Sequence, residues 1–256
     1  MTKEKSHKTK IIVALDYTNP LDALEMASKL RDHVDGFKIN HALWSQSVYI
    51  KDYTKDNELF IDCKLWDTPN TVKQVLQKIV DKGATMTTIS TFNNEAVFDV
   101  AQEYAEQIKL LAVTYLTSWN PEEQRQIAKD MPYNMWRDHV ARIRHKGFKG
   151  IICSPLDIVQ IKHEDFMHDL YRVCPGIKYE SELKGQSRTT TPKEAQELGA
   201  DYLVIGRSIT QADDPIEVAN RIRKELDMLE PDYYVRNYPD GFSKEWRDSG
   251  RTETQD

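Results

Sequence analysis

Residues 59–82 read LFIDCKLWDTPNTVKQVLQKIVDK, which is a strand pattern followed directly by a helix pattern. Apolar and charged side chains alternate over 61–65, as in a β-strand with two different faces. Pro69 follows Thr68, a combination that is typical of a helix start, and apolar residues then recur at three- and four-residue spacing. Gly83 is placed to end this helix. The segment therefore predicts one β/α unit.

The same unit recurs along the chain. Further helices are predicted over 20–31 and 93–107, the first after an Asn–Pro start. Eight alternations of strand and helix favour an α/β fold of the (β/α)8 TIM-barrel type. A doubly wound sheet is the competing fold, but it normally has fewer strands. The predicted strands cover 11–15, 36–39, 59–64, 85–89, 109–114, 150–153, 170–174 and 202–205.

The predicted barrel is a single domain over 11–230, preceded by an N-terminal arm over 1–10. The connection over 119–147 is longer than one barrel connection requires, so we expect an extra helical element there. The C-terminal tail over 231–256 breaks the pattern, and we expect it to be partly disordered.

The composition is that of a globular chain, with 39% hydrophobic and 30% charged residues among 256. A net charge of −6 lacks the footprint of a general nucleic-acid binder. No apolar run is long enough for a membrane helix or a signal peptide. Three widely spaced cysteines, Cys63, Cys153 and Cys174, indicate reduced and buried thiols. We therefore expect a cytoplasmic protein that binds neither nucleic acid nor membrane.

Charged residues end the first three predicted strands. Alternation places Asp62 and Lys64 on the face opposite the apolar side chains, pointing into the barrel at the carboxyl end, where barrel active sites lie. Asp67 follows on the loop, Lys38 ends the second strand and Asp16 ends the first. Such a charge array is costly unless it is used, which favours a catalytic role. The alternative is a structural ion pair at the barrel rim.

A candidate phosphate site follows the last two strands. Pro175 comes after the seventh strand, and Gly206 and Arg207 come after the eighth. Barrels often bind phosphate with these loops, and an arginine grips two phosphate oxygens at once. Gln186, in the long loop over 178–191, is a candidate lid residue. The histidines lack metal-ligand spacing and no P-loop or dinucleotide fingerprint is present, so no metal or cofactor is predicted.

These motifs resemble the orotidine 5′-phosphate decarboxylase family. Its signature Asp-x-Lys-x-x-Asp-Ile-Pro-Asn-Thr is matched by residues 62–71, with Thr68 in place of isoleucine. Ala-Leu-Asp at 14–16, Lys38, Pro-Gly-Ile at 175–177 and Gly-Arg at 206–207 match in the same order. The likeness runs from about residue 11 to residue 226, which is nearly the whole predicted barrel.

The resemblance implies a barrel enzyme that converts orotidine 5′-monophosphate to uridine 5′-monophosphate and carbon dioxide without metal or cofactor. It implies that Lys64 donates a proton to C6 of the pyrimidine and that Asp62 lies beside the departing carboxylate. It further implies that Lys38 and Asp16 hold ribose hydroxyls.

The resemblance also implies a homodimer with shared active sites. Asp67 and Thr71 would then reach into the neighbouring subunit's site, and Ser118 would touch the pyrimidine ring. The remaining implied substrate contacts line the base edge and the phosphate: Pro175, Gln186, Gly206 and Arg207.

Three features depart from the family pattern. The lid usually carries Gly-Asp-Gln-Arg, whereas residues 185–188 read Gly-Gln-Ser-Arg. Trp119 stands where a histidine is common, and the tail lies outside the pattern.

Two alternatives remain open. One is a magnesium-dependent 3-hexulose-6-phosphate synthase or 3-keto-gulonate-phosphate decarboxylase of the same superfamily, whose motif typically continues with Ala-Gly instead of the Pro-Asn-Thr at 69–71. The other is a non-catalytic phosphate-binding barrel, against which the intact Lys64 argues.

Overall fold

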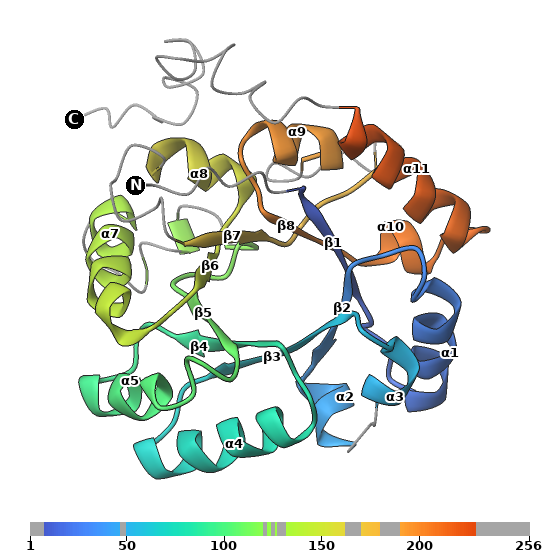
Figure 1. Cartoon of the computed structure of the whole chain (residues 1–256). Coiled ribbons are helices and arrows are strands. Elements are labelled where there is room, and N and C mark those ends of the chain that lie inside the picture. The colour runs from blue at the N-terminus through green and yellow to red at the C-terminus, as the bar shows by residue number, and fades with distance from the viewer. Residues whose placement is uncertain are drawn as a thin grey trace.

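Eight parallel strands form a closed barrel, and helices surround it on the outside (Figure 1). Each strand pairs with the next one along the chain, and the first strand pairs with the last through the register Lys10 to Tyr202. The predicted fold class is therefore confirmed. The strands are β1 (Lys10–Ala14), β2 (Gly36–Asn40), β3 (Glu58–Leu65), β4 (Met86–Ser90), β5 (Lys109–Val113), β6 (Gly150–Ile152), β7 (Tyr171–Cys174) and β8 (Tyr202–Ile205).

The computed structural model describes residues 8–46, 50–119, 122–123, 126, 132–161, 170–179 and 190–228. The C-terminal tail, most of the N-terminal arm, the candidate lid residue Gln186 and part of the 119–147 connection lie outside the described residues. Within the part of the chain that the structure describes, no helix has the length and apolar character needed to cross a membrane.

The helices follow the strands in the order that the sequence predicts. The helices predicted over 20–31 and 70–82 agree with α1 (Pro20–Leu30) and α4 (Pro69–Asp81) to within a residue at each end. Part of the long connection after β5 is helical, as expected. The described helices are α1 (Pro20–Leu30), α2 (His41–Ser45), α3 (Lys51–Thr54), α4 (Pro69–Asp81), α5 (Glu95–Gln102), α7 (Pro132–Ile143), η1 (Arg144–Lys146), α8 (Pro155–Ile161), α9 (Pro192–Glu197), α10 (Arg207–Thr210) and α11 (Pro215–Asp227).

The helix predicted over 93–107 is shorter in the structure. The Asn94 side chain accepts a hydrogen bond from the Val97 amide at 3.2 Å, which caps α5 at its first turn. After Gln102 the chain continues in tight turns, in which the Gln107 amide donates to the Tyr104 carbonyl at 2.9 Å. The apolar periodicity thus extends beyond the regular helix because the turns keep burying residues against the same core.

The residues that mark helix starts and helix ends in the sequence lie at those positions in the structure. The Asn19 side chain caps α1, accepting from the Leu21 amide. Thr68 occupies the cap position of α4, although its side chain makes no capping hydrogen bond. Gly83 and Gly199 follow α4 and α9 with positive φ angles of 73° and 99°, which glycine adopts readily.

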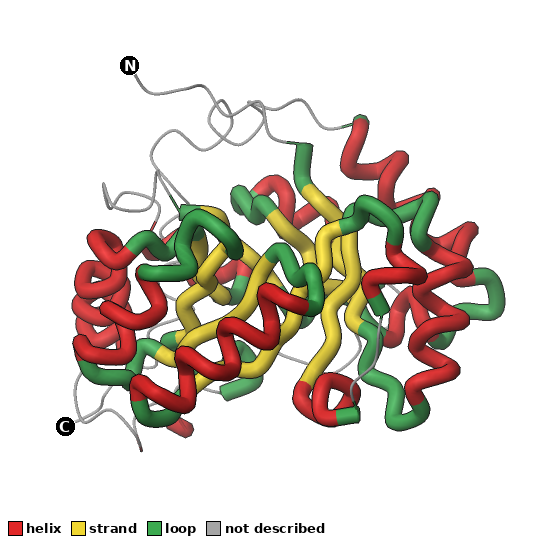
Figure 2. Tube along the Cα trace, turned by 60° about the horizontal axis from the view of Figure 1, so that its bottom comes forward, coloured by secondary structure: helices red, strands yellow, loops and turns green. Residues whose placement is uncertain are grey.

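Figure 2 shows the helices around the outside of the strands. Alternation along these strands produces two hydrophobic layers. Ile11, Val13 and Leu15 face outward and pack against the surrounding helices, while Ile12 and Ala14 face into the barrel. The inner layer is filled by side chains, so the barrel is a packed core rather than a pore. Its other members are Phe60, Met86, Leu111, Val173, Tyr202 and Val204.

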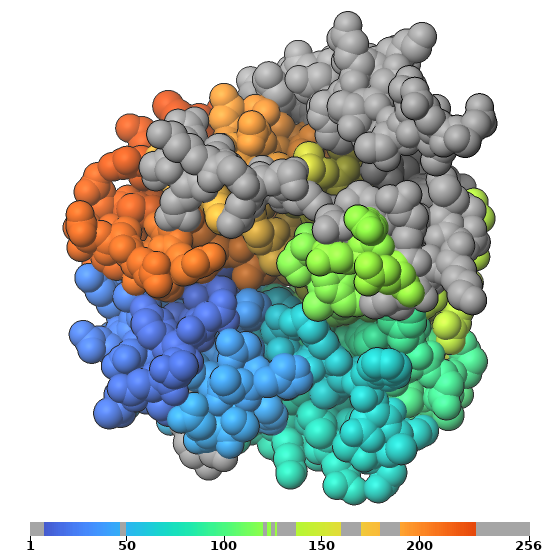
Figure 3. All heavy atoms as spheres, turned by 180° about the vertical axis from the view of Figure 1, so that it is seen from behind, coloured from blue at the N-terminus to red at the C-terminus, as the bar shows by residue number. Residues whose placement is uncertain are grey.

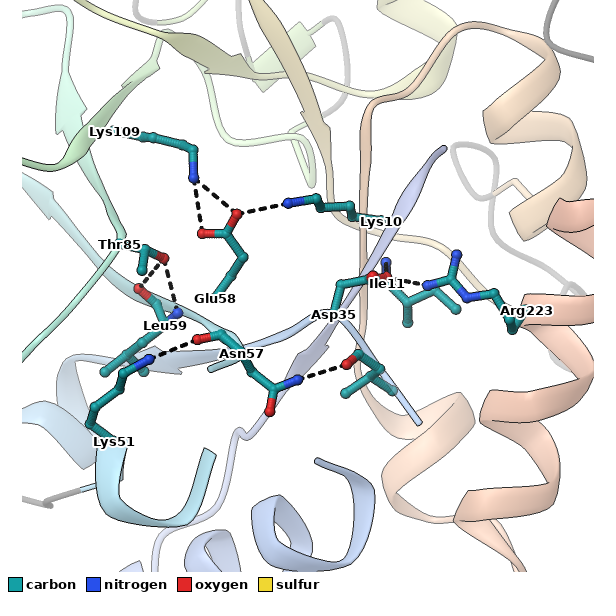
Figure 4. Close-up of polar contacts among 11 residues, drawn as sticks. Lys10, Ile11, Asp35, Lys51, Asn57, Glu58, Leu59, Thr85, Lys109 and Arg223 are labelled. Atoms are coloured by element: carbon teal, nitrogen blue, oxygen red, sulfur yellow. Dashed lines mark hydrogen bonds and ion pairs between the residues drawn. The ribbon is translucent and has the colours of Figure 1, made fainter. Parts of the chain in front are cut away.

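A half-buried glutamate lies at the opposite end of the barrel from the carboxyl ends of the strands. Glu58 begins β3, and its carboxylate contacts Lys10 and Lys109 at 2.9 Å each (Figure 4). Burial alone would raise its pKa, but hydrogen bonds from Thr85 and the two lysines outweigh it and lower the pKa to about 2. This ion-pair cluster ties β1, β3 and β5 together at the floor of the barrel.

Candidate active site

Four charged side chains form a continuous array at the carboxyl ends of β1, β2 and β3. Asp16 Oδ1 lies 3.3 Å from Lys38 Nζ, and Lys38 Nζ lies 3.8 Å from Asp62 Oδ2. Asp62 Oδ2 in turn accepts from Lys64 Nζ at 2.8 Å. The signs alternate along the array, so that each inner member has two neighbours of opposite charge. The structure therefore brings together four of the residues that the sequence singled out.

Strand alternation puts these side chains on one side. Lys38 and Asn40 share the inner face of β2, and Asp16 follows the end of β1. Asn40 Nδ2 donates to Asp16 Oδ1 at 3.1 Å, while Asn40 Oδ1 accepts from the amides that begin α2. Sequence reasoning missed Asn40, although its position two residues beyond Lys38 places it on the same face.

The electrostatics of the array keep its central carboxylate ionised. Burial would raise the pKa of Asp62, but Lys64 and Lys38, together with hydrogen bonds from Lys64 and Thr88, hold it below its usual value. The two lysines differ in access, because the Lys38 side chain is 11% exposed and the Lys64 side chain 38%. Lys64 is thus the ammonium that is more open to a ligand.

Lys64 has an unusual backbone conformation. Its φ of 47° lies in the left-handed region, which costs roughly 1–2 kcal/mol for a residue with a Cβ. Between the pairs Ile61–Thr87 and Leu65–Ile89 the register shifts, because β3 advances by four residues and β4 by two. The inward direction of Lys64 therefore depends on a bulge, which a simple strand pattern does not reveal.

Asp67 and Thr71 lie outside the array. Both are exposed; Asp67 Oδ1 accepts from the Thr68 amide at 2.6 Å, and the Thr71 hydroxyl lies 3.0 Å from that of Thr68. Among the described residues, Asp67 forms no ion pair with either lysine of the array. Trp66, beside it, is 72% exposed. This loop thus presents an acid and a large aromatic ring at the surface of the subunit.

The loops after β7 and β8 meet each other. The Tyr179 amide donates to Ser208 Oγ at 3.3 Å, which joins the segment after Pro175 to the segment after Gly206. Arg207 begins α10 and is exposed. In the view from behind, the orange atoms of the segment that includes α10 and α11 lie beside the blue atoms of the segment that includes β1 and α1 (Figure 3).

The predicted lid is anchored at both of its ends. Ile177 pairs with Thr190, and the Lys178 amide donates to the Thr190 carbonyl at 3.0 Å. The residues that flank 180–189 therefore lie next to each other, close to the loops that follow β7 and β8. Gln186 itself lies outside the described residues.

Ser118 is exposed in the turn after β5, next to the half-buried Trp119. The Trp119 ring lies 6.4 Å from the Tyr115 ring, so it packs in an aromatic group near this turn. No hydrogen bond between described residues joins Ser118 to a member of the array. Among the described residues, no group of three or more histidine, cysteine, aspartate or glutamate side chains is placed to hold a metal ion.

A closed parallel barrel with ammonium and carboxylate groups gathered at the carboxyl ends of its strands is the arrangement of a barrel enzyme. The chain belongs to the orotidine 5′-phosphate decarboxylase / HUMPS family, whose model matches residues 9–222.

Named relatives match over nearly the whole barrel. An orotidine 5′-phosphate decarboxylase of Dictyoglomus thermophilum is 35% identical, covering 86% of this chain and 96% of that protein. One of Desulfosudis oleivorans is 33% identical, with coverage of 88% and 96%. The crystal structure of the enzyme from Lactobacillus acidophilus superposes with a TM-score of 0.74 at 30% identity, covering 86% of this chain and 99% of that one.

Proposed function

We propose that this protein decarboxylates orotidine 5′-monophosphate to uridine 5′-monophosphate. Relatives that are 30% identical or more over nearly their whole length carry this name, and the chain contains the Asp-x-Lys-x-x-Asp-x-Pro-Asn-Thr run at 62–71. The observation that carries the proposal is the array Asp16–Lys38–Asp62–Lys64, in which Lys64 is the more exposed of the two ammonium groups.

The array suits this reaction because decarboxylation at C6 of the pyrimidine leaves a localised carbanion. The bond between C6 and the carboxyl carbon breaks, its electron pair stays on C6, and carbon dioxide departs. Lys64 Nζ stabilises this pair by its charge and then transfers a proton to C6, so the product is neutral at that carbon. The proposed step uses no metal or cofactor.

Asp62 has two functions in this scheme. Its contact with Lys64 Nζ at 2.8 Å holds the ammonium in position to donate. Its charge also lies beside the carboxylate of the bound substrate, where repulsion is relieved when carbon dioxide leaves. We assign Lys38 and Asp16 to the ribose hydroxyls.

Substrate binding away from the reacting carbon is assigned to the loops after β5, β7 and β8. Arg207 and Gly206 would hold the phosphate, because a guanidinium makes two charged hydrogen bonds and glycine lets the backbone approach. Such remote binding energy helps to align the base over Lys64. The other proposed contacts are Ser118, Pro175 and Gln186.

We further propose a homodimer with shared sites. Asp67 is exposed and unpaired with its own lysines, and Thr71 lies beside it on the first turn of α4. An exposed carboxylate next to the exposed Trp66 ring suits contact with a second copy, in which Asp67 and Thr71 would complete the partner's ribose site.

The test is an assay on the purified protein with a chelator present. Orotidine 5′-monophosphate should lose its orotate absorbance and yield uridine 5′-monophosphate and carbon dioxide. Binding of uridine 5′-monophosphate without turnover would instead favour a non-catalytic barrel. Magnesium-dependent activity on a sugar phosphate, with none on the nucleotide, would favour the synthase alternative.

A further inference from the structure

Thr88 is a fully buried threonine on the inner face of β4, and it touches two members of the charge array. Its side-chain hydroxyl donates to Asp62 Oδ1 at 2.7 Å and accepts from the Lys64 amide at 2.8 Å. A hydroxyl has one proton and two lone pairs, so it satisfies both partners at once. One atom thus links the Asp62 carboxylate to the Lys64 backbone.

The Lys64 amide needs such a partner because the register between β3 and β4 shifts at this point. In a regular parallel pair, an amide on β3 would donate to a backbone carbonyl of the neighbouring strand. At the bulge the Thr88 hydroxyl takes that role, while the φ of Lys64 is held at 47°. A left-handed non-glycine residue persists only where its surroundings hold it.

The same hydroxyl also divides the two oxygens of Asp62 between different partners. Because Oδ1 accepts from Thr88, Oδ2 is left to face Lys64 Nζ at 2.8 Å and Lys38 Nζ at 3.8 Å. Thr88 therefore orients both the carboxylate and the backbone from which the Lys64 side chain starts.

We propose that Thr88 is a positioning residue for the decarboxylation, which aims the Lys64 ammonium and the Asp62 carboxylate at the reacting carbon. This inference rests on the proposed function, because Thr88 acts only through Asp62 and Lys64. A proton donor that is misplaced by a fraction of an ångström loses much of its effect, so the loss should fall on kcat more than on KM.

The neighbouring Thr87 provides a matched control. It is equally buried, and its hydroxyl donates to the Ile61 carbonyl at 2.8 Å, but it contacts no member of the array. Thr87→Val and Thr88→Val remove the same hydroxyl from adjacent positions of one strand while preserving side-chain shape. A difference in kcat between the two variants therefore reflects the contacts of the Thr88 hydroxyl with Asp62 and Lys64.

The experiment compares kcat, KM and the pH profile of kcat for wild type, Thr88→Val, Thr88→Ser and Thr87→Val. We expect Thr88→Val to lower kcat about 10–100-fold with KM within about threefold of wild type. Thr88→Ser restores the hydroxyl and should recover most of kcat. Thr87→Val should keep kcat close to the wild-type value.

The pH profile separates positioning from simple loss of stability. Thr88, Lys64 and Lys38 are the groups that face Asp62, and each of them favours its ionised form. Removing the Thr88 bond should raise the pKa of Asp62, so the acid limb of kcat should move to higher pH. Thr87→Val should leave that limb in place.

The proposal is overturned if Thr88→Val keeps wild-type kcat and acid limb, if Thr87→Val loses as much, or if Thr88→Ser fails to recover. If Thr88→Val does not fold, Thr88→Ser and Thr88→Ala make the same comparison, since they differ by the hydroxyl alone. Failure of the wild type to turn over the nucleotide would instead refute the function, so the two failures are distinguishable.

Discussion

Lys38 on β2 and Asp62 on β3 approach each other across neighbouring strands, with Nζ and Oδ2 3.8 Å apart. Lys38 also contacts Asp16, so it lies between two carboxylates, whereas Lys64 at the end of the array contacts Asp62. The two lysines therefore differ in how firmly they are held. The enclosed lysine is suited to maintain the array, and the proposed mechanism makes the terminal lysine the proton donor.

Replacing the terminal lysine should remove the chemistry but keep the fold. We expect Lys64→Ala to lower kcat at least about 10³-fold, because it removes both the proton donor and the charge that stabilises the carbanion. Lys73→Ala is the matched control, since Lys73 is an exposed residue of α4 whose ion pair is with Glu103, outside the array. The absorbance assay measures kcat, and circular dichroism measures whether the fold is kept. A near-normal rate for Lys64→Ala would contradict the assignment.

Shared sites should be visible by complementation. Lys64→Ala and Asp67→Ala are each expected to be inactive alone. In a mixed dimer one site carries both defects and the other neither, so random exchange should restore about a quarter of the wild-type sites. Activity is measured after subunit exchange, which is verified by mass spectrometry of tagged chains. Persistent inactivity would place Asp67 in the site of its own chain.

The phosphate assignment predicts a graded loss at Arg207. We expect Arg207→Ala to lower kcat/KM by about 10–100-fold, the cost of losing charged hydrogen bonds to the phosphate. Arg207→Lys keeps the charge but not the two-point contact, and it should fall between alanine and wild type. Arg221→Ala, which removes an exposed pair with Glu217, is the control. Equal effects of Arg207→Ala and Arg221→Ala would argue against a phosphate contact.

The barrel floor predicts a pH-dependent stability. The pKa of Glu58 is lowered to about 2 in the folded protein, compared with about 4.5 in the unfolded chain. The ionised carboxylate therefore stabilises the fold fully above pH 4.5, and this stabilisation is lost as the pH falls toward 2. We expect Glu58→Gln to lower the free energy of unfolding by roughly 1–2 kcal/mol at pH 7, since water screens the partly exposed lysines.

Urea unfolding at pH 7 and at successively lower pH values tests this expectation. The difference between wild type and Glu58→Gln should shrink as the pH falls, because the wild-type carboxylate becomes protonated there. A difference that stays constant down to pH 2 would show that Glu58 stabilises by packing instead of by charge.

Period-two alternation was enough to predict that Asp62 and Lys64 share a face, and the order of the β/α units predicted the barrel. Alternation assumes a regular strand, however, and Lys64 is held by a bulge in the pairing with β4. At that bulge the Lys64 amide donates to Thr88, which is 24 residues away in the chain and unremarkable as a strand residue. Its alternation with Met86 and Ser90 was the available signal.

Helix boundaries show a related limit. The apolar spacing over 93–107 predicts one long helix, but Asn94 caps it late and the turns after Gln102 end it early. Periodicity reports which side chains are buried, and both turns and helices bury residues at that spacing. The short helices α2, α3 and α10 contain too few residues for any period to be recognised.

The pairing of β1 with β8 has a consequence for synthesis on the ribosome. The strands that carry the array are made first, yet β1 stays an open sheet edge until residues 202–205 have emerged and can pair with it. The nascent chain therefore holds its acidic and basic side chains in an unfinished sheet for most of translation. A pause or truncation before residue 202 would leave that edge available to other chains, which makes the final strand the one that protects the protein from aggregation.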